Sequence, residues 1–190
     1  MSVNGNMTGV RLRKTVVLVG MMGAGKTAVG REMARRIAVP FLDSDEEIQH
    51  AANMTIAEIF ARDGEAFFRR REAEVIARLM REQRAILSVG GGAFLNADTR
   101  ALISELGVSV WLRADLELLW SRVKGKTTRP LLRTDNPRAT LAALMAAREQ
   151  HYALADMVVD ARPGYAIGDM AAKVLETLAM RPGVLEGYGE

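Results

Sequence analysis

The stretch GMMGAGKT, residues 20–27, has the residue types and spacing of a phosphate-binding loop. It satisfies the pattern G-x-x-x-x-G-K-[ST] and lies between an apolar run and a helical segment, as that pattern requires. Backbone N–H groups of such a loop surround phosphates, Lys26 would reach the β- and γ-phosphates, and the Thr27 hydroxyl would contact Mg²⁺. The sequence therefore predicts a nucleoside triphosphate site with the contacts Gly23, Ala24, Gly25, Lys26, Thr27 and Ala28.

The run FLDSD (41–45) ends in two carboxylates, Asp43 and Asp45. On a strand, this spacing places both side chains on the same side of the sheet. Two like charges side by side need a compensating cation, and Mg²⁺ with its bound waters meets that need. We expect Asp43 to hold Mg²⁺ through water and Asp45 to accept a hydrogen bond from a substrate hydroxyl. The alternative is that Asp45 or Ser44 only caps a helix beginning at Glu46.

Three consecutive arginines, Arg69, Arg70 and Arg71, lie in a long amphipathic segment. Successive helix residues are about 100° apart, so the three cannot all face one ligand. Arg70 points away from the apolar stripe, whereas Arg69 and Arg71 lie on its two borders, and periodicity does not decide between them. Glu72 follows Arg69 at helical contact spacing and could hold that guanidinium. The alternative is a solvated charged face. The apolar stripe consists of Phe68, Val75 and Leu79.

The run SVGGG (88–92) places Gly90, Gly91 and Gly92 behind a further short apolar segment. Glycine costs about 0.5–1 kcal/mol in regular structure relative to alanine, so three in a row need a reason. We expect them to line a substrate site, because backbone without side chains allows close approach of a ligand. The alternative is a bulge or turn before the next helix.

These loops need a scaffold that brings them together, and short apolar runs alternating with helical stretches predict one. Five strands alternating with helices indicate an α/β fold with a parallel sheet covered on both faces. Right-handed crossovers place the loops after the strands along one edge, where ligands bind. The expected strands are 15–20, 41–45, 85–89, 108–113 and 157–161, and the expected helices are 26–38, 46–52, 55–64, 65–83, 98–106, 115–124, 137–155 and 167–180.

The 190 residues suit one domain, which we expect over residues 15–180. Residues 1–14 have no apolar core and are expected to form a disordered lead-in, and 181–190 a tail. The net charge of +3 does not indicate a nucleic-acid partner, and no apolar stretch has the length of a membrane helix. With no cysteine, the chain has no disulfide framework, in keeping with a cytoplasmic protein.

Five motifs occur in the order found in shikimate kinases: GMMGAGKT, FLDSD, DGEAFFRRRE, SVGGGA and RPLL. The likeness runs from about residue 15 to 180, so the chain resembles that family. The resemblance implies a three-layer P-loop kinase fold with a mobile lid at about 123–136. It also implies ATP-dependent phosphorylation of the 3-hydroxyl of shikimate, giving shikimate 3-phosphate and ADP, a step of chorismate and aromatic amino-acid biosynthesis. ATP/ADP and shikimate are then the partners, Mg²⁺ the cofactor, and a monomer the expected state.

The resemblance assigns acceptor contacts to matching positions. Asp45 would bind the shikimate hydroxyls and take the proton of the attacking one. Arg69, rather than Arg71, would hold the carboxylate together with Arg148. Gly90, Gly91 and Gly92 would line the acceptor side, where Gly91 and Gly92 would offer N–H groups.

On the donor side, the resemblance makes Arg129 of TTRPLL the lid arginine that approaches the transferred phosphate. It places Asp43 in the Mg²⁺ shell with Thr27. Arg122, together with Arg162 and Pro163 of DARP, would flank the adenine.

Two other functions remain open from the residues. Another small-molecule kinase of this fold, acting on gluconate or a nucleotide, would use the same phosphate-binding loop. An aromatic content of 5% argues against a nucleotide acceptor, which needs a base-stacking pocket. A regulatory ATP-binding module without transfer activity is the alternative from a different class.

Overall fold

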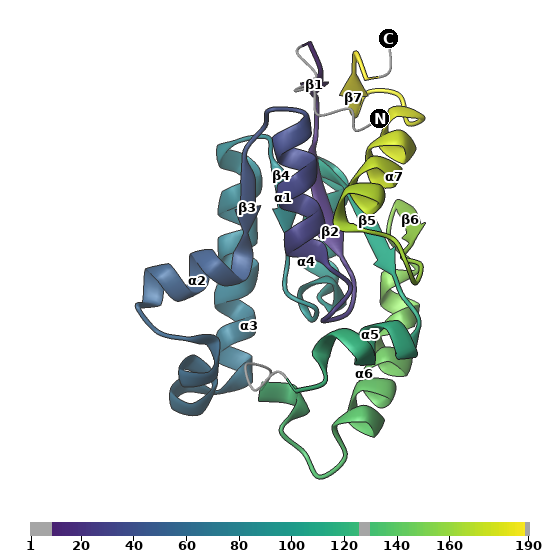
Figure 1. Ribbon diagram of the computed structural model, residues 1–190. Helices are drawn as coiled ribbons and strands as arrows, with labels where there is room; N and C mark the ends of the chain where they lie inside the picture. Colours follow the sequence, from purple (N-terminus) through teal and green to yellow (C-terminus); the bar gives the residue numbers. More distant parts are fainter. Residues whose placement is uncertain (1–8, 126–129, 189–190) are drawn as a thin grey trace.

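The computed structural model describes residues 9–125 and 130–188, which are built around a five-stranded parallel sheet (Figure 1). The strand order is β3-β4-β2-β5-β6, and every pairing is parallel. The predicted α/β class and parallel sheet are confirmed. The strands are β2 (Thr15–Val19), β3 (Phe41–Asp43), β4 (Ile86–Ser88), β5 (Gly107–Arg113) and β6 (Met157–Asp160).

Strand β2 occupies the centre of the sheet and carries the phosphate-binding loop at its carboxyl end. Val16 pairs with Ile86 of β4 on one side and with Val108 of β5 on the other. Val16, Val17 and Leu18 are fully buried, as expected for a strand covered on both faces. The connection after β2 leads to β3 on one side of the sheet, whereas the connection after the adjacent strand β4 leads to β5 on the other side. The loop after β2 therefore lies at the switch point where such sheets bind ligands.

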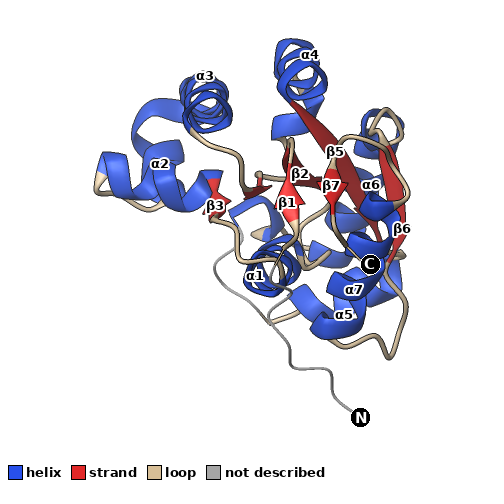
Figure 2. Cartoon of the chain, turned by 90° about the horizontal axis from the view of Figure 1, so that it is seen from above, coloured by secondary structure: helices blue, strands red, loops and turns tan. Residues whose placement is uncertain are grey.

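Helices cover both faces of the sheet, with α1 and α7 on one face and α3 and α4 on the other (Figure 2). Two short 3₁₀ helices, η1 (Ala93–Leu95) and η2 (Pro130–Leu132), follow the glycine run and the start of the lid segment. Arg129 and the rest of 126–129 lie outside the described residues. The helices are α1 (Lys26–Arg36), α2 (Ser44–Ala52), α3 (Ile56–Glu82), α4 (Ala97–Leu106), α5 (Leu116–Val123), α6 (Pro137–Tyr152) and α7 (Ile167–Ala179).

Strand β3 ends at Asp43, so the expectation that the strand continues to Asp45 is wrong. Asp43 is the N-cap of α2, and its Oδ1 accepts hydrogen bonds from the N–H groups of Asp45 and Glu46 at 3.0 and 3.4 Å. Aspartate is among the best N-cap residues, and here it starts the helix two residues earlier than expected. Asp45 therefore lies in the first turn of α2.

Helix α3 is broken at Gly64, whose φ of 82° and ψ of 167° are not helical. This confirms that the segment consists of two helices that meet at this glycine. The first helix begins with a capping box, in which Thr55 and Glu58 satisfy each other's backbone N–H groups. Beneath this region a small apolar cluster, centred on Ile48, Ile59 and Phe68, is separate from the main core.

The two chain ends form a second, two-stranded sheet, in which β1 (Arg11–Leu12) pairs antiparallel with β7 (Leu185–Glu186). Arg13 forms an ion pair with Glu186 at 2.7 Å. The expected disordered lead-in is therefore wrong for residues 11–14, because the tail supplies a pairing partner that a local reading of the sequence does not show. Among the described residues, no helix has the length and hydropathy needed to cross a bilayer.

Candidate active site

A cavity of about 470 Å³ lies at the carboxyl end of β2 and is lined by residues 22–29 of the phosphate-binding loop. Helix α1 begins at Lys26 and has no side-chain cap, so its first N–H groups face this cavity. The Lys26 ammonium donates to the carbonyls of Gly20 and Met21 at 2.8 and 3.1 Å, folded back across the loop. The loop therefore combines an uncapped helix N-terminus with a lysine ammonium, an arrangement suited to binding an anion.

Helix α5 packs against the outside of the phosphate-binding loop. Arg122 Nη1 donates to the carbonyls of Gly23 and Ala24 at 3.1 and 3.3 Å. Gly23 has a φ of +83°, and a Cβ there would lie 2.8 Å from Val123 Cγ1. Glycine is therefore required at this position both for its backbone conformation and for the close approach of α5.

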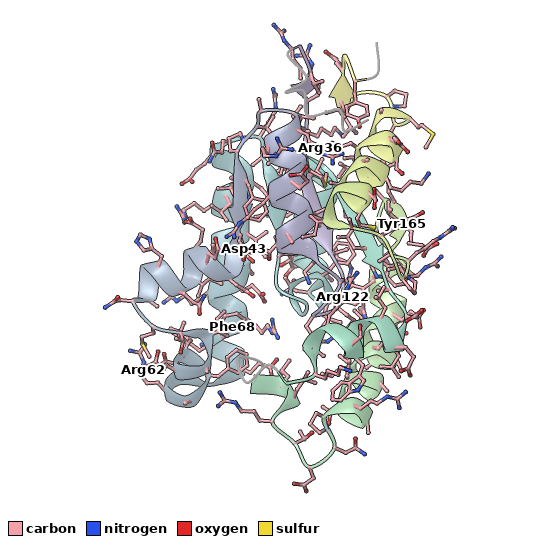
Figure 3. The ribbon with its side chains drawn as sticks, in the orientation of Figure 1. Arg36, Asp43, Arg62, Phe68, Arg122 and Tyr165 are labelled. Atoms are coloured by element: carbon pink, nitrogen blue, oxygen red, sulfur yellow. The ribbon has the colours of Figure 1, made fainter. Side chains whose placement is uncertain are left out.

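The far wall of this donor cavity comes from the segment between β6 and α7. Figure 3 shows Tyr165 and Arg122 on one side of the opening and Asp43 on the other. Arg122 lines the cavity as expected, whereas Arg162 and Pro163 are exposed and are not among its lining residues. The residues that do line it here are Ala161, Tyr165, Ala166, Ile167 and Met170.

Thr27 and Asp43 meet at the floor of the donor cavity, where the Thr27 hydroxyl donates to Asp43 Oδ2 at 2.9 Å. Asp43 is 8% exposed, and the Ser88 hydroxyl lies 3.5 Å from that of Thr27. Hydroxyl and carboxylate oxygens of this kind suit Mg²⁺, which takes few direct protein ligands and keeps several waters. The donor set therefore fits the expected metal. The alternative, in which Asp45 or Ser44 only caps the helix, is wrong, since Asp43 itself caps α2.

A second cavity, of about 580 Å³, adjoins the first and is lined by every residue assigned to the acceptor. Among the residues assigned to the acceptor, Asp45, Arg69 and Arg148 line the cavity with charged side chains, and Gly90, Gly91 and Gly92 line it with backbone. Both cavities share part of their lining, so the two ligands would meet there. The shared residues are Met22, Thr27, Asp43, Asp45, Gly90 and Gly91.

Arg69 is the arginine of the triplet that faces the acceptor cavity. Its side chain is 26% exposed and donates to Glu72 Oε2 at 2.7 Å, whereas Arg71 is 56% exposed and pairs with Glu74. Arg70 is exposed, as the helical periodicity predicts. Burial raises the pKa of the Glu72 carboxyl, although the charge of Arg69 acts in the opposite direction.

The glycine run is required because charged side chains pack directly against its backbone. A Cβ on Gly92 would lie 2.5 Å from the Arg69 Cζ, and one on Gly90 would lie 3.0 Å from an Asp45 carboxylate oxygen. A Cβ on Gly91 would lie 3.3 Å from Arg148 Nη1. These glycines therefore leave room for the acceptor-binding side chains themselves, a reason that the sequence alone does not reveal.

Sequence reasoning missed the apolar wall of the acceptor cavity and two polar residues behind it. The wall comes from α3, on both sides of Gly64, and from the lid segment, and its members are Ile56, Phe60, Phe68 and Leu131. Ser44, fully buried, accepts a hydrogen bond from the Gly90 N–H at 3.3 Å, and Tyr152 contacts Gly91. The helix expected over 55–64 gave no sign that its apolar residues line a cavity.

A parallel sheet with a phosphate-binding loop on its central strand and a second, arginine-bearing cavity beside that loop defines a P-loop kinase of small molecules. The shikimate kinase family model matches residues 22–179, which is most of the chain. The chain therefore belongs to the shikimate kinase family.

Individual relatives agree with this assignment. A shikimate kinase from Cereibacter sphaeroides is 61% identical, with 96% of this chain and 92% of the relative covered. One from Ruegeria pomeroyi is 61% identical over 92% of this chain and 90% of the relative. The solved structure of a shikimate kinase from Acinetobacter baumannii in complex with shikimate is 37% identical, with a TM-score of 0.84 over 88% of this chain and 93% of that one.

Proposed function

We propose that this protein transfers the γ-phosphoryl group of ATP to the 3-hydroxyl of shikimate, giving shikimate 3-phosphate and ADP. The observation that carries the proposal is the lining of the acceptor cavity. Asp45 lies on the wall that this cavity shares with the donor cavity, whereas Arg69 and Arg148 line the acceptor cavity only. Shikimate has a carboxylate for the arginines and ring hydroxyls for the carboxylate. The family membership supports the same substrate.

The donor cavity is proposed to bind ATP with its phosphates on the backbone N–H groups of residues 23–28 and its adenine near Arg122 and Tyr165. The family resemblance also places Arg162 and Pro163 beside the adenine, although these two residues do not line the donor cavity. Lys26 would neutralise charge on the β- and γ-phosphates. The contact of Arg122 with the loop carbonyls supports a second role, in holding the loop in its binding shape.

Thr27 and Asp43 are proposed to hold Mg²⁺, Thr27 by its hydroxyl and Asp43 through a water. When bound, the ion would supply positive charge that offsets the negative charge of the phosphates. The hydrogen bond between Thr27 and Asp43 supports this assignment, because it brings both oxygens to one point of the donor cavity. Asp43 also caps α2, so the same carboxylate fixes the helix turn that carries Asp45.

In the acceptor cavity, Arg69 and Arg148 are proposed to hold the carboxylate of shikimate, and Asp45 to align the attacking hydroxyl and take its proton. Phosphoryl transfer depends mainly on positioning and charge stabilisation, so alignment by Asp45 matters more than its basicity. Gly91 and Gly92 would donate N–H groups to the acceptor. Each charge-assisted contact of this kind contributes about 1.5–3 kcal/mol.

The segment 123–136 is proposed to act as the lid, with Arg129 approaching the transferred phosphate. Leu131 and Arg133, at the end of this segment, already line the acceptor cavity. A cover at this position would exclude water, the competing acceptor.

We also propose that the protein is a monomer and that it works in the cytoplasm. Gel filtration at a mass close to that of one chain would support the monomer.

The decisive experiment measures ADP release with ATP and Mg²⁺ in three parallel reactions, with shikimate, with gluconate and with no acceptor. We expect a rate with shikimate far above the other two. A rate with gluconate that exceeds that with shikimate would favour the other small-molecule kinase. Tight ATP binding with no acceptor-dependent release would favour a regulatory module.

A further inference from the structure

Each carbonyl of the triple-glycine run accepts a hydrogen bond. The Gly90 carbonyl accepts from Ala93 N–H at 3.0 Å, and that of Gly92 from Leu95 N–H at 3.2 Å. These two bonds are local and come from the 3₁₀ turn that follows. The Gly91 carbonyl instead accepts from the hydroxyl of Tyr152, 61 residues away on α6. Glycine is the most conformationally free residue, so a run of three needs such external contacts to hold one orientation.

Tyr152 is built into the core as a fixed element. It is 1% exposed, and its ring packs against Trp111 with ring centroids 5.9 Å apart. Its hydroxyl lies 3.7 Å from the Met21 sulfur, at the start of the phosphate-binding loop. A tyrosine hydroxyl has one proton with which to donate a hydrogen bond, and here it donates to the Gly91 carbonyl.

Arg148 lies one turn before Tyr152 on the same face of α6, since residues four apart on a helix are neighbours. A Cβ on Gly91 would lie 3.3 Å from Arg148 Nη1 and 3.6 Å from the Tyr152 hydroxyl, so both side chains pack against the same backbone atom. Burial raises the pKa of the Tyr152 hydroxyl, and the adjacent Arg148 guanidinium opposes that shift. The hydroxyl therefore lies between the guanidinium and the Gly91 carbonyl.

We propose that Tyr152 is a positioning residue that sets the acceptor site through the Gly91–Gly92 peptide and Arg148. A peptide is planar and trans, so a Gly91 carbonyl held by Tyr152 directs the Gly92 N–H the opposite way. Within the described part of the chain, the Gly91 and Gly92 N–H groups make no backbone hydrogen bond. Tyr152 does not line the acceptor cavity, whereas Gly91, Gly92 and Arg148 do, so it acts through them.

The kinetic test of this inference rests on the proposed function. It uses the variant Tyr152→Phe, which removes the hydroxyl and keeps the ring. We expect the KM for shikimate to rise about tenfold, because the Gly91 carbonyl loses its partner and the loop its orientation. The KM for ATP should stay within about twofold, because Tyr152 is not part of the donor cavity lining. The matched control is Thr15→Val, which removes another buried hydroxyl, bonded to Gln83 O at 3.3 Å at the opposite end of β2.

A second readout does not depend on the acceptor. Order parameters of the Gly91 and Gly92 amides, from ¹⁵N relaxation in the free protein, should fall in Tyr152→Phe and stay unchanged in Thr15→Val. Unchanged order parameters at these two amides would overturn the proposal, as would an unchanged KM for shikimate in an enzyme that phosphorylates it. A wild-type protein inactive on shikimate would contradict the proposed function alone, since the order parameters still decide the role of Tyr152.

Discussion

Glu72 supports Arg69 from the protein interior: its Oε2 accepts a hydrogen bond from Arg69 Nη1 at 2.7 Å, while Glu72 itself is only 2% exposed. The other carboxylate oxygen, Oε1, has no hydrogen-bond partner among the described residues. The charges of Asp45 and Arg148 also act on this carboxyl. Glu72 is therefore electrostatically coupled to the charged residues of the acceptor cavity, Arg69, Asp45 and Arg148.

The first prediction concerns Glu72→Gln, which keeps the shape and removes the charge. Arg69 then keeps only one ion pair, that with the exposed Glu65, so we expect the KM for shikimate to rise about tenfold, with the KM for ATP unchanged. Glu72 should also affect how the free energy of unfolding depends on pH. Because burial raises the pKa of Glu72 above its ordinary 4.5, the folded state binds this proton more tightly than the unfolded chain.

The Glu72 contribution to stability is therefore complete below pH 4.5 and is lost as the pH rises through the folded-state pKa. Denaturant unfolding at several pH values should show the advantage of wild type over Glu72→Gln decreasing as the pH rises. A difference that grows with pH would mean that the pairing with Arg69 outweighs burial.

The second prediction separates the neighbouring arginines by matched substitutions, Arg69→Lys and Arg71→Lys. A lysine keeps the charge but loses the planar, bidentate contact with a carboxylate. We expect Arg69→Lys to raise the KM for shikimate by about tenfold or more and to leave the KM for ATP near normal. Arg71→Lys should match wild type in both, since Arg71 is exposed and pairs with Glu74. Equal losses for both substrates in Arg69→Lys would indicate a folding defect.

The third prediction is that the added methyl group of Gly92→Ala weakens shikimate binding by displacing the Arg69 guanidinium. Its Cβ would lie 2.5 Å from the Arg69 Cζ, so the guanidinium must move. Calorimetry should show weaker shikimate binding and unaltered nucleotide binding. Wild-type affinity for shikimate in this variant would show that the position of Arg69 against the glycine run is not needed for binding.

The fourth prediction concerns Asp156, which accepts hydrogen bonds from the Ser109 N–H and hydroxyl at 2.9 and 2.8 Å and pairs with Arg181. Burial favours a higher pKa, but these contacts outweigh it and bring the pKa below the ordinary 3.8. The resulting stability is present above pH 3.8 and is lost as the pH falls through the folded-state pKa.

Asp156→Asn should therefore lower the free energy of unfolding at pH 7 by about 1–2 kcal/mol, and the difference should shrink at strongly acidic pH. Asp160→Asn is the control, because its ion pair with Arg113 is half-exposed and contributes little. An equal loss of unfolding free energy in both variants would show that the contacts of Asp156 contribute no more than an exposed ion pair.

The fifth prediction follows from the family resemblance and concerns Arg129, which lies outside the described residues. We expect Arg129→Ala to lower kcat far more than it raises the KM for shikimate, since the lid arginine contacts charge that develops in the transition state. Arg138→Ala, in the exposed pair with Glu117, serves as the control. A change in KM alone would make Arg129 a ground-state contact.

Sequence patterns were sufficient for the five strands of the parallel sheet and for the helices, because each of these strands contains a short apolar run and each helix has a recognisable period. They were not sufficient at Asp45, because an aspartate after a strand can continue it or lie in the first turn of a capped helix. They left Arg69 and Arg71 equivalent, because helical periodicity places both at the border of the same stripe. The difference comes from Glu72, a buried partner on one side only.

Contacts between distant segments were beyond a local reading. The hydrogen bond from Tyr152 to Gly91 and the pairing of β1 with β7 join residues far apart in the chain. Nothing near Gly92 in the sequence shows that an arginine side chain rests on its Cα. Such features depend on how the elements pack, which neither periodicity nor motif spacing encodes.

The pairing of β1 with β7 makes the two ends of the described chain neighbours, and a Cβ on Gly187 would lie 2.9 Å from the Gly9 carbonyl oxygen. Figure 1 shows this pair at the end of the molecule opposite α5 and η2. A short linker between residues 9 and 187 would therefore close the backbone into a ring. Circular permutants reopened at the exposed loop around Arg84, between α3 and β4, should keep both cavities, because Arg84 lines neither of them. Attachment to a surface through either end leaves the cavities facing the solution.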